Sequence, residues 1–494
     1  MAESYPSLPE LGVGITHSAL IEPALEQWPD LFDVIEFEPQ TSWIETRDGA
    51  EPYRASDLVL DHIIKLPGQK LVHSIGVPVG GTVRPQPAQL ALLRRTIAKF
   101  DAPWVSEHLN FNRTQEFSTG FFLPPRQTLQ GVETATTSIR DLQAALPVPI
   151  AVETGVNYLR PRPDEMPDGA FVATVTERAN CGILLDLHNL FTNSVNGRQS
   201  VEEFITQLPL ERVWEIHLAG GFEMEGFWLD AHSGAIPDTL LSIAREIVPT
   251  LPNLKAIVFE LFPSFVPGFG FDGIRTEMEK LHDLWELRSG APPDKVRIHR
   301  AWESGAKIEE CASPAIWERA LGSLVIGRKP DDEVARELAT DPGVAVINHL
   351  ACEFRASMIV SVLRLTSRLL MLALGPDTFR AMLEEFWSKT PPQLFASSEA
   401  EAFAAYLDAL DLKVPQLTKI LEFERAVMAT LMDDSPRVVA FDFDPLPLFR
   451  GLAEGRLKEK AGRLGRFEIE VTGDGLLNAP NLGLGPLQQA VPHH

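Results

Sequence analysis

Residues 182–189 read Gly-Ile-Leu-Leu-Asp-Leu-His-Asn, an apolar run that ends in polar side chains. An apolar run without polar alternation is typical of a strand that is buried on both faces, as in a parallel sheet covered by helices. A second run of this kind, residues 256–259, reads Ala-Ile-Val-Phe and ends in Glu260. The two segments therefore predict buried parallel strands that end in charged residues.

Six further short apolar runs alternate with longer, helix-like stretches between Gly12 and about Glu286. The eight predicted strands are Gly12–Thr16, Asp33–Glu38, Lys70–Ile75, Trp104–Glu107, Pro149–Glu153, Gly182–Asp186, Val213–His217 and Ala256–Glu260. Strands that alternate with helices are typical of crossover connections between parallel strands. Eight such units predict an α/β fold, a closed (β/α)8 TIM barrel, which takes about 250 residues.

After Pro292 the apolar residues recur at helical spacing. The predicted helical segments are Ile316–Val325, Val334–Leu338, Val344–Leu374, Phe379–Trp387, Ala400–Leu410 and Leu417–Leu431. Two later segments, Arg437–Phe443 and Arg466–Thr472, alternate apolar with polar residues and predict a short β element. We expect a barrel over residues 1–290, a linker over 291–315, a mainly α-helical C-terminal domain over 316–476 and a flexible tail over 477–494.

The composition narrows the function classes. Hydrophobic residues make up 45% of the 494 residues, as in proteins with a buried core. The sequence has 44 Lys and Arg against 68 Asp and Glu, a formal charge of −24, which repels a phosphate backbone. We therefore expect no nucleic-acid partner. The three cysteines, Cys181, Cys311 and Cys352, are too few for a disulfide framework or a thiolate zinc site.

Two further features concern location. The N-terminal residues 1–6 show neither a basic segment nor an apolar one, so we expect no signal peptide and a cytoplasmic protein. The most apolar helical stretch, Met358–Leu374, is interrupted by Arg364 and Arg368. These charges favour a buried amphipathic helix, and no membrane partner is expected.

Polar residues that can bind metals end almost every predicted strand. They are Glu36, His73, Glu107, His108, Glu153, Asp186, His188, Asn189, His217 and Glu260, with Asp230 and His232 in the loop after the seventh strand. The active sites of (β/α)8 barrels lie at this end of the strands. One such residue alone is more often a structural group. Together they would leave unpaired charges in a confined space, and divalent cations are the simplest way to neutralise them.

The residue types indicate which metals fit. Imidazole and carboxylate ligands without thiolates suit Fe, Mn or Zn better than Cu(I) or an iron–sulfur cluster. Three or more histidines with four or more carboxylates exceed the needs of one ion, so we expect two or three ions that share carboxylates. The remaining polar groups would orient the ligands.

These blocks resemble the multinuclear non-heme iron-dependent oxidative enzymes, a family that includes the catalytic subunit of methanobactin biosynthesis. The resemblance covers about the first 290 residues. The matching blocks are Gly12–Ile15, His73–Val77, Ser106–Leu109, Glu153 with Asn157–Leu159, Leu184–Asp186, Glu215–Gly220, Asp230 with His232, and Glu260. Their order and number make the resemblance more specific than any single motif.

The resemblance implies the ligands and the chemistry. The implied iron ligands are His73, His108, Glu153, Asp186, His217, Asp230, His232 and Glu260, of which Glu153, Asp186, His217 and Glu260 would be catalytic and Glu153 and Glu260 bridging. The implied cofactor is two or three iron ions, mixed Fe²⁺ and Fe³⁺, with O₂ as co-substrate. The implied substrate is a ribosomally synthesised precursor peptide, modified at a cysteine whose thiolate binds a ferric ion.

One motif departs from the family pattern. Many relatives carry Asp-x-Asn-Asn where this chain has Asp186-Leu187-His188-Asn189. His188 could be a further ligand, a substrate contact or a packed polar residue, and the departure leaves the metal count and reaction outcome open. The residues predicted to orient ligands or to contact substrate are His17, Glu36, Glu107, Asn157, His188 and Asn189. For His17, a structural or helix-capping role is an equal alternative.

The C-terminal domain faintly resembles the separate partner proteins that deliver peptides to such enzymes. This resemblance rests on the segments Leu417–Glu424 and Val438–Phe443. A β edge in this domain could bind peptide by strand addition. Alternatively, the domain only stabilises the barrel or a homodimer.

Two other functions remain open for this barrel. A divalent-metal hydrolase or endonuclease, or a sugar isomerase, also places His, Asp and Glu at the strand ends. A binding scaffold without catalysis is the second alternative, although the implied ligand set is intact. Iron at two or three ions per chain would favour oxidation, whereas zinc or manganese without iron would favour the hydrolase or isomerase.

Overall fold

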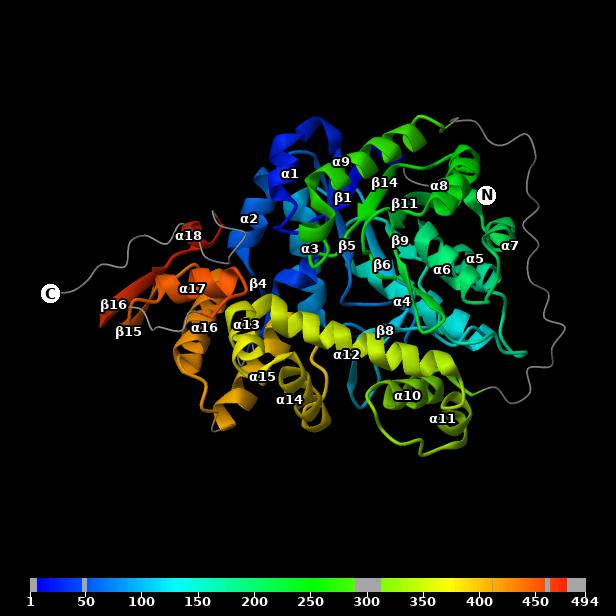
Figure 1. Ribbon diagram of the computed structural model, residues 1–494. Coiled ribbons are helices and arrows are strands. Elements are labelled where there is room, and N and C mark those ends of the chain that lie inside the picture. Colours follow the sequence, from blue (N-terminus) through cyan, green and yellow to red (C-terminus); the bar gives the residue numbers. More distant parts are fainter. Residues whose placement is uncertain (1–6, 47–50, 289–311, 411, 458–462, 478–494) are drawn as a thin grey trace. The chain divides into compact units, whose positions relative to one another are not determined.

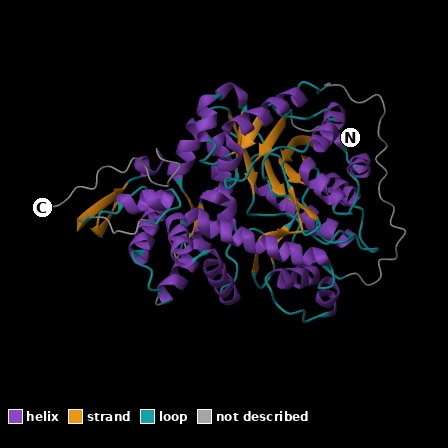
Figure 2. Ribbon diagram, viewed as in Figure 1, coloured by secondary structure: helices purple, strands orange, loops and turns teal. Residues whose placement is uncertain are grey.

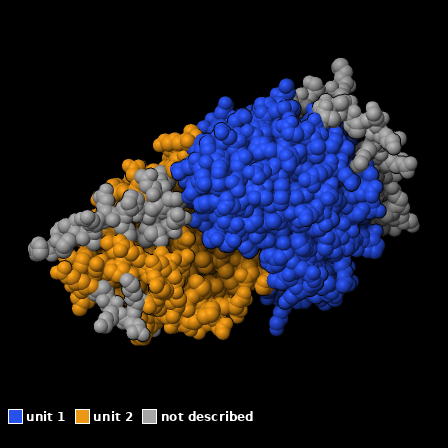
Figure 3. Space-filling view, turned by 45° about the horizontal axis from the view of Figure 1, so that its top comes forward, with its two compact units in different colours: residues 1–39, 66–348 blue, residues 40–65, 349–494 orange. Residues whose placement is uncertain are grey.

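The computed structural model describes residues 7–46, 51–288, 312–410, 412–457 and 463–477. The chain forms two compact units, which Figure 3 colours separately. The barrel unit comprises residues 1–39 and 66–348, and the helical unit comprises residues 40–65 and 349–494. Most of the predicted linker, and all of the predicted tail except residue 477, lie outside the described residues.

The barrel unit is built on a closed barrel of eight parallel strands, as predicted. In order around the barrel the strands are β1 (Gly12–Thr16), β2 (Val34–Phe37), β5 (Gln69–Ser74), β6 (Val105–His108), β9 (Ile150–Glu153), β10 (Gly182–Asp186), β11 (Val213–Ala219) and β14 (Ala256–Glu260). Each of the eight apolar runs forms one strand, and β14 pairs with β1 to close the ring. Figure 2 shows the strands of this unit enclosed by helices.

The connections supply the outer helices and two hairpins (Figure 1). The helices are α1 (Glu22–Gln27), α3 (Pro87–Phe100), α4 (Leu129–Ala145), α5 (Asp168–Ala179), α6 (Leu187–Val195), α7 (Val201–Gln207), α8 (Asp238–Ile247) and α9 (Val266–Trp285). The hairpins are β7 (Phe111–Arg113) with β8 (Ser118–Leu123), and β12 (Phe222–Met224) with β13 (Phe227–Leu229). Both hairpins follow the C-terminal end of a barrel strand, where the polar residues lie.

The connection between β2 and β5 is unusual because it belongs to the helical unit. It contains β3 (Trp43–Glu45), β4 (Tyr53–Ala55) and α2 (Asp57–Lys65). The ring of Tyr53 meets Phe395 of the helical unit at 5.7 Å. The sequence of this segment is polar and helix-like, as in the other crossover connections, so its pattern does not predict that it belongs to a different unit.

Strand register places the polar strand ends beside one another. On neighbouring strands His108 pairs with Glu153, and Asp186 pairs with His217. The other end of the barrel is closed by an apolar cluster to which strands all round the ring contribute. The barrel therefore has one apolar end and one polar mouth.

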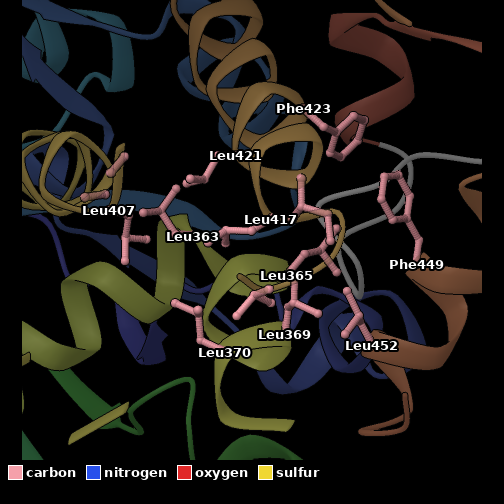
Figure 4. Packing of buried hydrophobic residues seen from close by; sticks show 14 of the residues in the cluster. Leu363, Leu365, Leu369, Leu370, Leu407, Leu417, Leu421, Phe423, Phe449 and Leu452 are labelled. Atoms are coloured by element: carbon pink, nitrogen blue, oxygen red, sulfur yellow. The ribbon is translucent and has the colours of Figure 1, made fainter. Parts of the chain in front are cut away.

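The helical unit confirms the prediction of a mainly helical C-terminal region with a short β element. Its later helices are α13 (Arg364–Leu374), α14 (Pro376–Lys389), α15 (Ala396–Ala409), α16 (Leu417–Asp433), α17 (Leu446–Ala453) and α18 (Gly473–Leu477). Strands β15 (Arg437–Phe443) and β16 (Leu464–Val471) pair antiparallel. Figure 4 shows Leu363, Leu370, Leu407 and Leu421 within the apolar core of this unit.

The boundary between the units falls inside a helix. Helices α10 (Pro314–Val325) and α11 (Glu333–Leu338) belong to the barrel unit, and α12 (Pro342–Val362) contains the division after Asn348. The predicted continuous segment Val344–Leu374 is interrupted at Leu363, whose φ of −97° and ψ of 56° are not helical. By length and composition α12 could cross a membrane, with a mean hydropathy of 1.2 and 44% of that window buried. Core helices of globular proteins meet the same criteria.

Candidate metal centre

The barrel mouth brings seven of the eight predicted ligands together in overlapping groups, and the eighth, Asp230, contacts His232 of one group. Within each group the ligand atoms lie within 4.8 Å of one another. Among the described residues the groups are His73 with His108 and Glu153, Glu153 with Asp186 and His217, Asp186 with His232 and Glu260, and Glu36 with Glu215 and His217. Because Glu153, Asp186 and His217 each belong to two groups, the arrangement can hold several ions that share ligands.

Glu153 lies between two imidazoles at the end of β9. Its Oε2 is 3.3 Å from Nε2 of His73 and 3.0 Å from Nε2 of His108. The other nitrogen of His73, Nδ1, is 2.8 Å from the hydroxyl of Ser106, which directs Nε2 toward Glu153. Burial and the neighbouring imidazoles, first that of His108, hold the pKa of His73 well below its usual range. His73 is therefore neutral, which is the form that binds metals.

His217 occupies the centre of the mouth and is fully buried. Its Nδ1 is 3.2 Å from Oε2 of Glu260, and its Nε2 is 3.1 Å from Oε2 of Glu36. Glu215, two residues earlier on β11, brings Oε1 to 3.6 Å from the same Nε2. Its Oε2 accepts a hydrogen bond of 3.0 Å from the indole of Trp104. Carboxylates therefore flank both nitrogens of His217.

The loop after β13 carries Asp230 and His232 into the mouth. Nε2 of His232 is 2.9 Å from Oδ1 of Asp230 and 3.6 Å from Oε2 of Glu260. The backbone of His232 has a φ of 44°, a left-handed conformation that is uncommon for a residue other than glycine. Hydrogen bonds from Ser233 N to Gly220 O (2.8 Å) and from Phe262 N to His232 O (3.0 Å) hold this turn. The strained turn aims the imidazole at the two carboxylates.

Many of these close approaches are not hydrogen bonds. In the described part of the chain, the buried atoms without a hydrogen-bond partner include Glu153 Oε2, Asp186 Oδ2, His217 Nδ1 and Nε2, His232 Nε2 and Glu260 Oε2. Buried polar atoms are normally satisfied, and several orphaned atoms around one point indicate an ion that the protein chain itself does not provide. The donor set of nitrogens and carboxylate oxygens fits Fe, Mn or Zn. The residues present therefore fit a multi-metal site.

Burial and neighbouring charges shift the pKa values of several groups at the mouth. Burial raises the pKa of Asp186 well above its usual range, and neighbouring carboxylates, first Glu260, raise it further. Burial would lower the pKa of His232, but Asp230 and Glu260 outweigh burial and raise it to about 10. Burial would raise the pKa of Glu260, yet His217 and His232 lower it to about 2. Shared cations would relieve the crowding of the carboxylates.

A second layer of hydrogen bonds orients the carboxylates. The amide of Asn189 donates to Glu153 Oε1 over 3.2 Å, and its backbone N–H donates to Asp186 Oδ1 over 2.8 Å. Asp186 is thereby the N-cap of α6, so the end of β10 and the start of the next helix fix both ligands. Glu107 accepts from Ser74 (2.6 Å) and from the backbone N–H groups of Val77 (3.0 Å) and His108 (2.9 Å). Asn189 thus binds one oxygen of Glu153 and one of Asp186, and the other oxygen of each stays available to an ion.

Among the predicted residues that belong to no ligand group, His17 and Asn157 have partners of their own. His17 forms a hydrogen bond with Glu22 of α1, with 3.0 Å between Nε2 and Oε1. The side chain of Asn157 accepts a hydrogen bond from the backbone N–H of Leu159, and the backbone N–H of Asn157 donates to the side chain of Asn193. Both contacts are of the structural kind. The roles assigned to the other predicted residues stay predictions, although the structure places them together.

Two residues of the mouth were not predicted as site residues. Glu215 belongs to a ligand group, and its position two residues before His217, on the same face of β11, was the available signal. Glu38 follows β2, and burial together with the charge of Glu260 raises its pKa to about 7. A carboxyl group of this pKa beside the ligands can hold or release a proton near neutral pH.

Comparison with known sequences finds one family and several relatives. The family described as RiPP precursor modification enzyme MbnB/TglH/ChrH matches residues 28–265. A UPF0276 protein of Streptomyces avermitilis is 31% identical over 246 residues, which cover 48% of this chain and 50% of the relative. A UPF0276 protein of Chromobacterium violaceum is 30% identical over 225 residues, which cover 44% of this chain and 80% of the relative. The chain thus spans about half the length of the first relative.

Comparison with solved structures gives matches of low identity. The IOLI protein with a binding zinc atom is 16% identical with a TM-score of 0.35, and the match covers 56% of this chain and 99% of that protein. Endonuclease IV from Thermus thermophilus is 12% identical with a TM-score of 0.36, and the match covers 56% of this chain and 100% of that protein. Likeness at this level carries no information on activity.

Proposed function

Because the chain belongs to the RiPP precursor modification enzymes of the MbnB/TglH/ChrH family, we propose that it is an iron- and O₂-dependent oxidoreductase that modifies a ribosomally synthesised peptide at a cysteine. The observation that carries this proposal is the overlap of the ligand groups at Glu153, Asp186 and His217. A single-ion hydrolase needs no such sharing. The overlap favours a site of several ions over a site of one ion. Sites with several ions also serve hydrolases, so the choice of oxidation rests on the family to which the chain belongs.

Each ion would be held by a different ligand group of the mouth. The group of His73, His108 and Glu153 would hold one ion, and the group of Asp186, His232 and Glu260 another, with His217 between them. Bound iron would supply electrons for O₂ reduction and a Lewis-acidic position for a thiolate. Asn189 keeps Glu153 and Asp186 in place, which fixes where the ligand oxygens point.

Aromatic rings cover two of the imidazoles. Phe122 stacks on His108 with 4.1 Å between ring centroids, and Phe262 lies 4.4 Å from His232. Phe262 is itself 42% exposed, so it offers an apolar surface to a substrate side chain beside the metal site.

The proposal is tested with metal analysis and a peptide assay. The protein is purified without oxygen, loaded with Fe(II), and its metal content is measured. The substrate is a short cysteine-containing peptide encoded in a neighbouring reading frame. We expect two or three iron ions per chain and an O₂-dependent mass change of the peptide, which should disappear when the peptide cysteine is replaced by serine. Zinc or manganese binding without iron, and a peptide that stays unchanged, would favour a hydrolase or isomerase instead.

A further inference from the structure

The hairpin β12–β13 is fastened to α6 through Trp228. The backbone N–H of Trp228 donates to Asn196 Oδ1, and its carbonyl accepts from Asn196 Nδ2, each over 2.8 Å. The indole also meets the ring of Phe191 edge-on, with centroids 5.7 Å apart. Asn196 is the C-cap of α6. Because Asp230 follows Trp228 by two residues, these contacts decide where Asp230 lies.

A directed hydrogen-bond chain links Trp228 to Asp230 through His188. The indole Nε1 of Trp228 lies 3.3 Å from Nε2 of His188, and Nδ1 of His188 lies 2.9 Å from Oδ1 of Asp230. An indole N–H can only donate, so Nε2 of His188 accepts. The proton of His188 is then on Nδ1, from which it donates to Asp230. His188 is fully buried, so water does not compete for either bond.

The backbone at Gly221 packs tightly against the hydrogen bond between Trp228 and His188. A Cβ atom at Gly221 would lie 2.6 Å from Nε1 of Trp228 and 2.8 Å from Nε2 of His188. Only glycine therefore lets the connection between β11 and β12 pass so close to the hydrogen bond. This packing independently fixes the two side chains against each other.

Asp230 borders one of the ligand groups. The oxygen that accepts from His188, Oδ1, is also 2.9 Å from Nε2 of His232. That nitrogen and Oε2 of Glu260 are both buried without a hydrogen-bond partner in the described part of the chain. His188 thus holds the carboxylate beside two orphaned ligand atoms, and as a neutral donor it leaves the negative charge of Asp230 available to a cation.

We propose that His188, fixed by Trp228, is a positioning residue that orients Asp230 toward an ion held by Asp186, His232 and Glu260, and so sets the affinity of that ion. The inference rests on the metal-binding part of the proposed function. His188 itself is not a ligand of this ion, because both of its nitrogens are engaged in hydrogen bonds.

Two amide substitutions separate the two nitrogens of His188. In His188→Asn the side-chain amide nitrogen replaces Nδ1 and keeps a donor toward Asp230. In His188→Gln the amide reaches the place of Nε2, so the donor to Asp230 is lost. With Fe(II) alone as the probe, we expect H188N, which keeps the donor to Asp230 but loses the contact with Trp228, to bind the wild-type number of ions, one of them about three- to tenfold more weakly. H188Q should bind one ion about 10- to 100-fold more weakly and lose one ⁵⁷Fe Mössbauer component, as for other residues that orient metal ligands.

A milder substitution covers the case in which His188 variants fail to fold. Trp228→Phe keeps an aromatic ring in the same place and removes the N–H, so one ion should bind about three- to tenfold more weakly. Circular dichroism of the metal-free proteins gives the folding control. Wild-type affinity in H188Q or in W228F, equal losses in H188N and H188Q, or weakening of every ion together would overturn the inference.

The same measurement keeps the inference apart from the proposed function. Wild-type protein that takes up Zn(II) or Mn(II) but not Fe(II) would contradict the iron-dependent oxidation. The ratio between H188N and H188Q would then be measured with the ion that does bind. Wild-type protein that binds Fe(II) while all variants behave alike would contradict only the role of His188.

Discussion

The barrel mouth and the core of the helical unit both bury carboxylates, but they treat them differently. In the helical unit Glu399 is fully buried and accepts from Arg355 Nε over 2.7 Å and from the backbone N–H of Gln393 over 2.9 Å. Glu424 accepts from the backbone N–H groups of Leu365 (2.6 Å) and Thr366 (3.0 Å) at the start of α13. Both oxygens of each carboxylate are thereby satisfied within the protein.

At the mouth, the carboxylates of Asp186 and Glu153 each have a hydrogen-bond partner on one oxygen only, among the described residues. Asp186 gives Oδ1 to the N–H of Asn189, while its buried Oδ2 has no hydrogen-bond partner among the described residues. Glu153 likewise gives Oε1 to Asn189 and leaves Oε2 buried and unpaired in the same sense. A buried charge with complete hydrogen bonds is a structural element, whereas one with an orphaned oxygen costs stability until a ligand arrives. This contrast predicts opposite responses to neutral substitutions.

The largest effect is expected for Asp186→Asn. The amide oxygen can still cap α6, but the negative charge and the orphaned acceptor are gone. We expect metal content to fall by at least one ion per chain and peptide modification to slow by about 10³-fold, equivalent to about 4 kcal/mol of barrier. The free energy of unfolding of the metal-free protein should stay equal or rise, because the crowded carboxylate charge is removed. Plasma mass spectrometry, a peptide assay and calorimetry measure these quantities. A metal-free variant that unfolds more easily would contradict the contrast.

The matched substitution in the helical unit, Glu399→Gln, should have the opposite pattern. It leaves the buried Arg355 without its counter-charge, so we expect a loss of about 3 kcal/mol in the stability of the helical unit. Metal content of the barrel mouth should not change. Hydrogen exchange of α15 and α14 reports on this unit separately from the barrel. A stable variant, or one that loses metal, would show that the two sets of carboxylates are not distinct.

Glu424 gives the helical unit a pH dependence. Burial raises its pKa from 4.5 to about 7, against the lowering effect of the hydrogen bonds from Thr366 and Leu365. Between these values the folded state binds a proton that the unfolded state has released, so stability falls as pH rises from 4.5 to 7. The shift corresponds to about 3 kcal/mol, and it levels off above pH 7.

Hydrogen exchange of α13 between pH 5 and 7.5, corrected for the intrinsic exchange rate, measures this slope. Glu424→Gln has no titrating group and should remove it. A slope of the opposite sign, or one that persists in the variant, would assign the pH dependence to other groups.

The barrel could be predicted from the sequence because each of its strands is an apolar run that can be recognised locally. Runs such as residues 183–185 are apolar without alternation, and polar residues end almost every run, so both the strand and the end that carries the site could be predicted from neighbouring residues. The ligand groups follow from this because parallel strands end at the same side of the barrel. The structure brings together His73, His108, Glu153, Asp186, His217, Asp230, His232 and Glu260 as expected.

What could not be predicted depends on long-range packing. The segment 40–65 reads as an ordinary crossover, yet it belongs to the helical unit, because the rings of Trp43 and Tyr53 pack against Phe395. The link between Trp228 and His188 joins residues 40 positions apart and has no local signature. A peptide-binding role for the helical unit also stays a prediction.

The smallest effect is expected when one buried hydroxyl, that of Ser106, is removed from beside a metal ligand. Ser106 holds Nδ1 of His73 at 2.8 Å, so Ser106→Ala should free the ring and weaken the ion of that group about tenfold, or about 1.4 kcal/mol. Ser138→Ala is the matched control, because Ser138 is also buried and its hydroxyl accepts from the guanidinium of Arg84 instead of orienting a ligand. Both substitutions remove one buried hydroxyl and should cost similar stability, about 1 kcal/mol. Only the first should change the Fe(II) affinity. If both variants bind iron equally well, then Ser106 does not orient His73. The contrast between polar groups with complete hydrogen bonds and polar groups that serve the metal site would then hold only for the carboxylates.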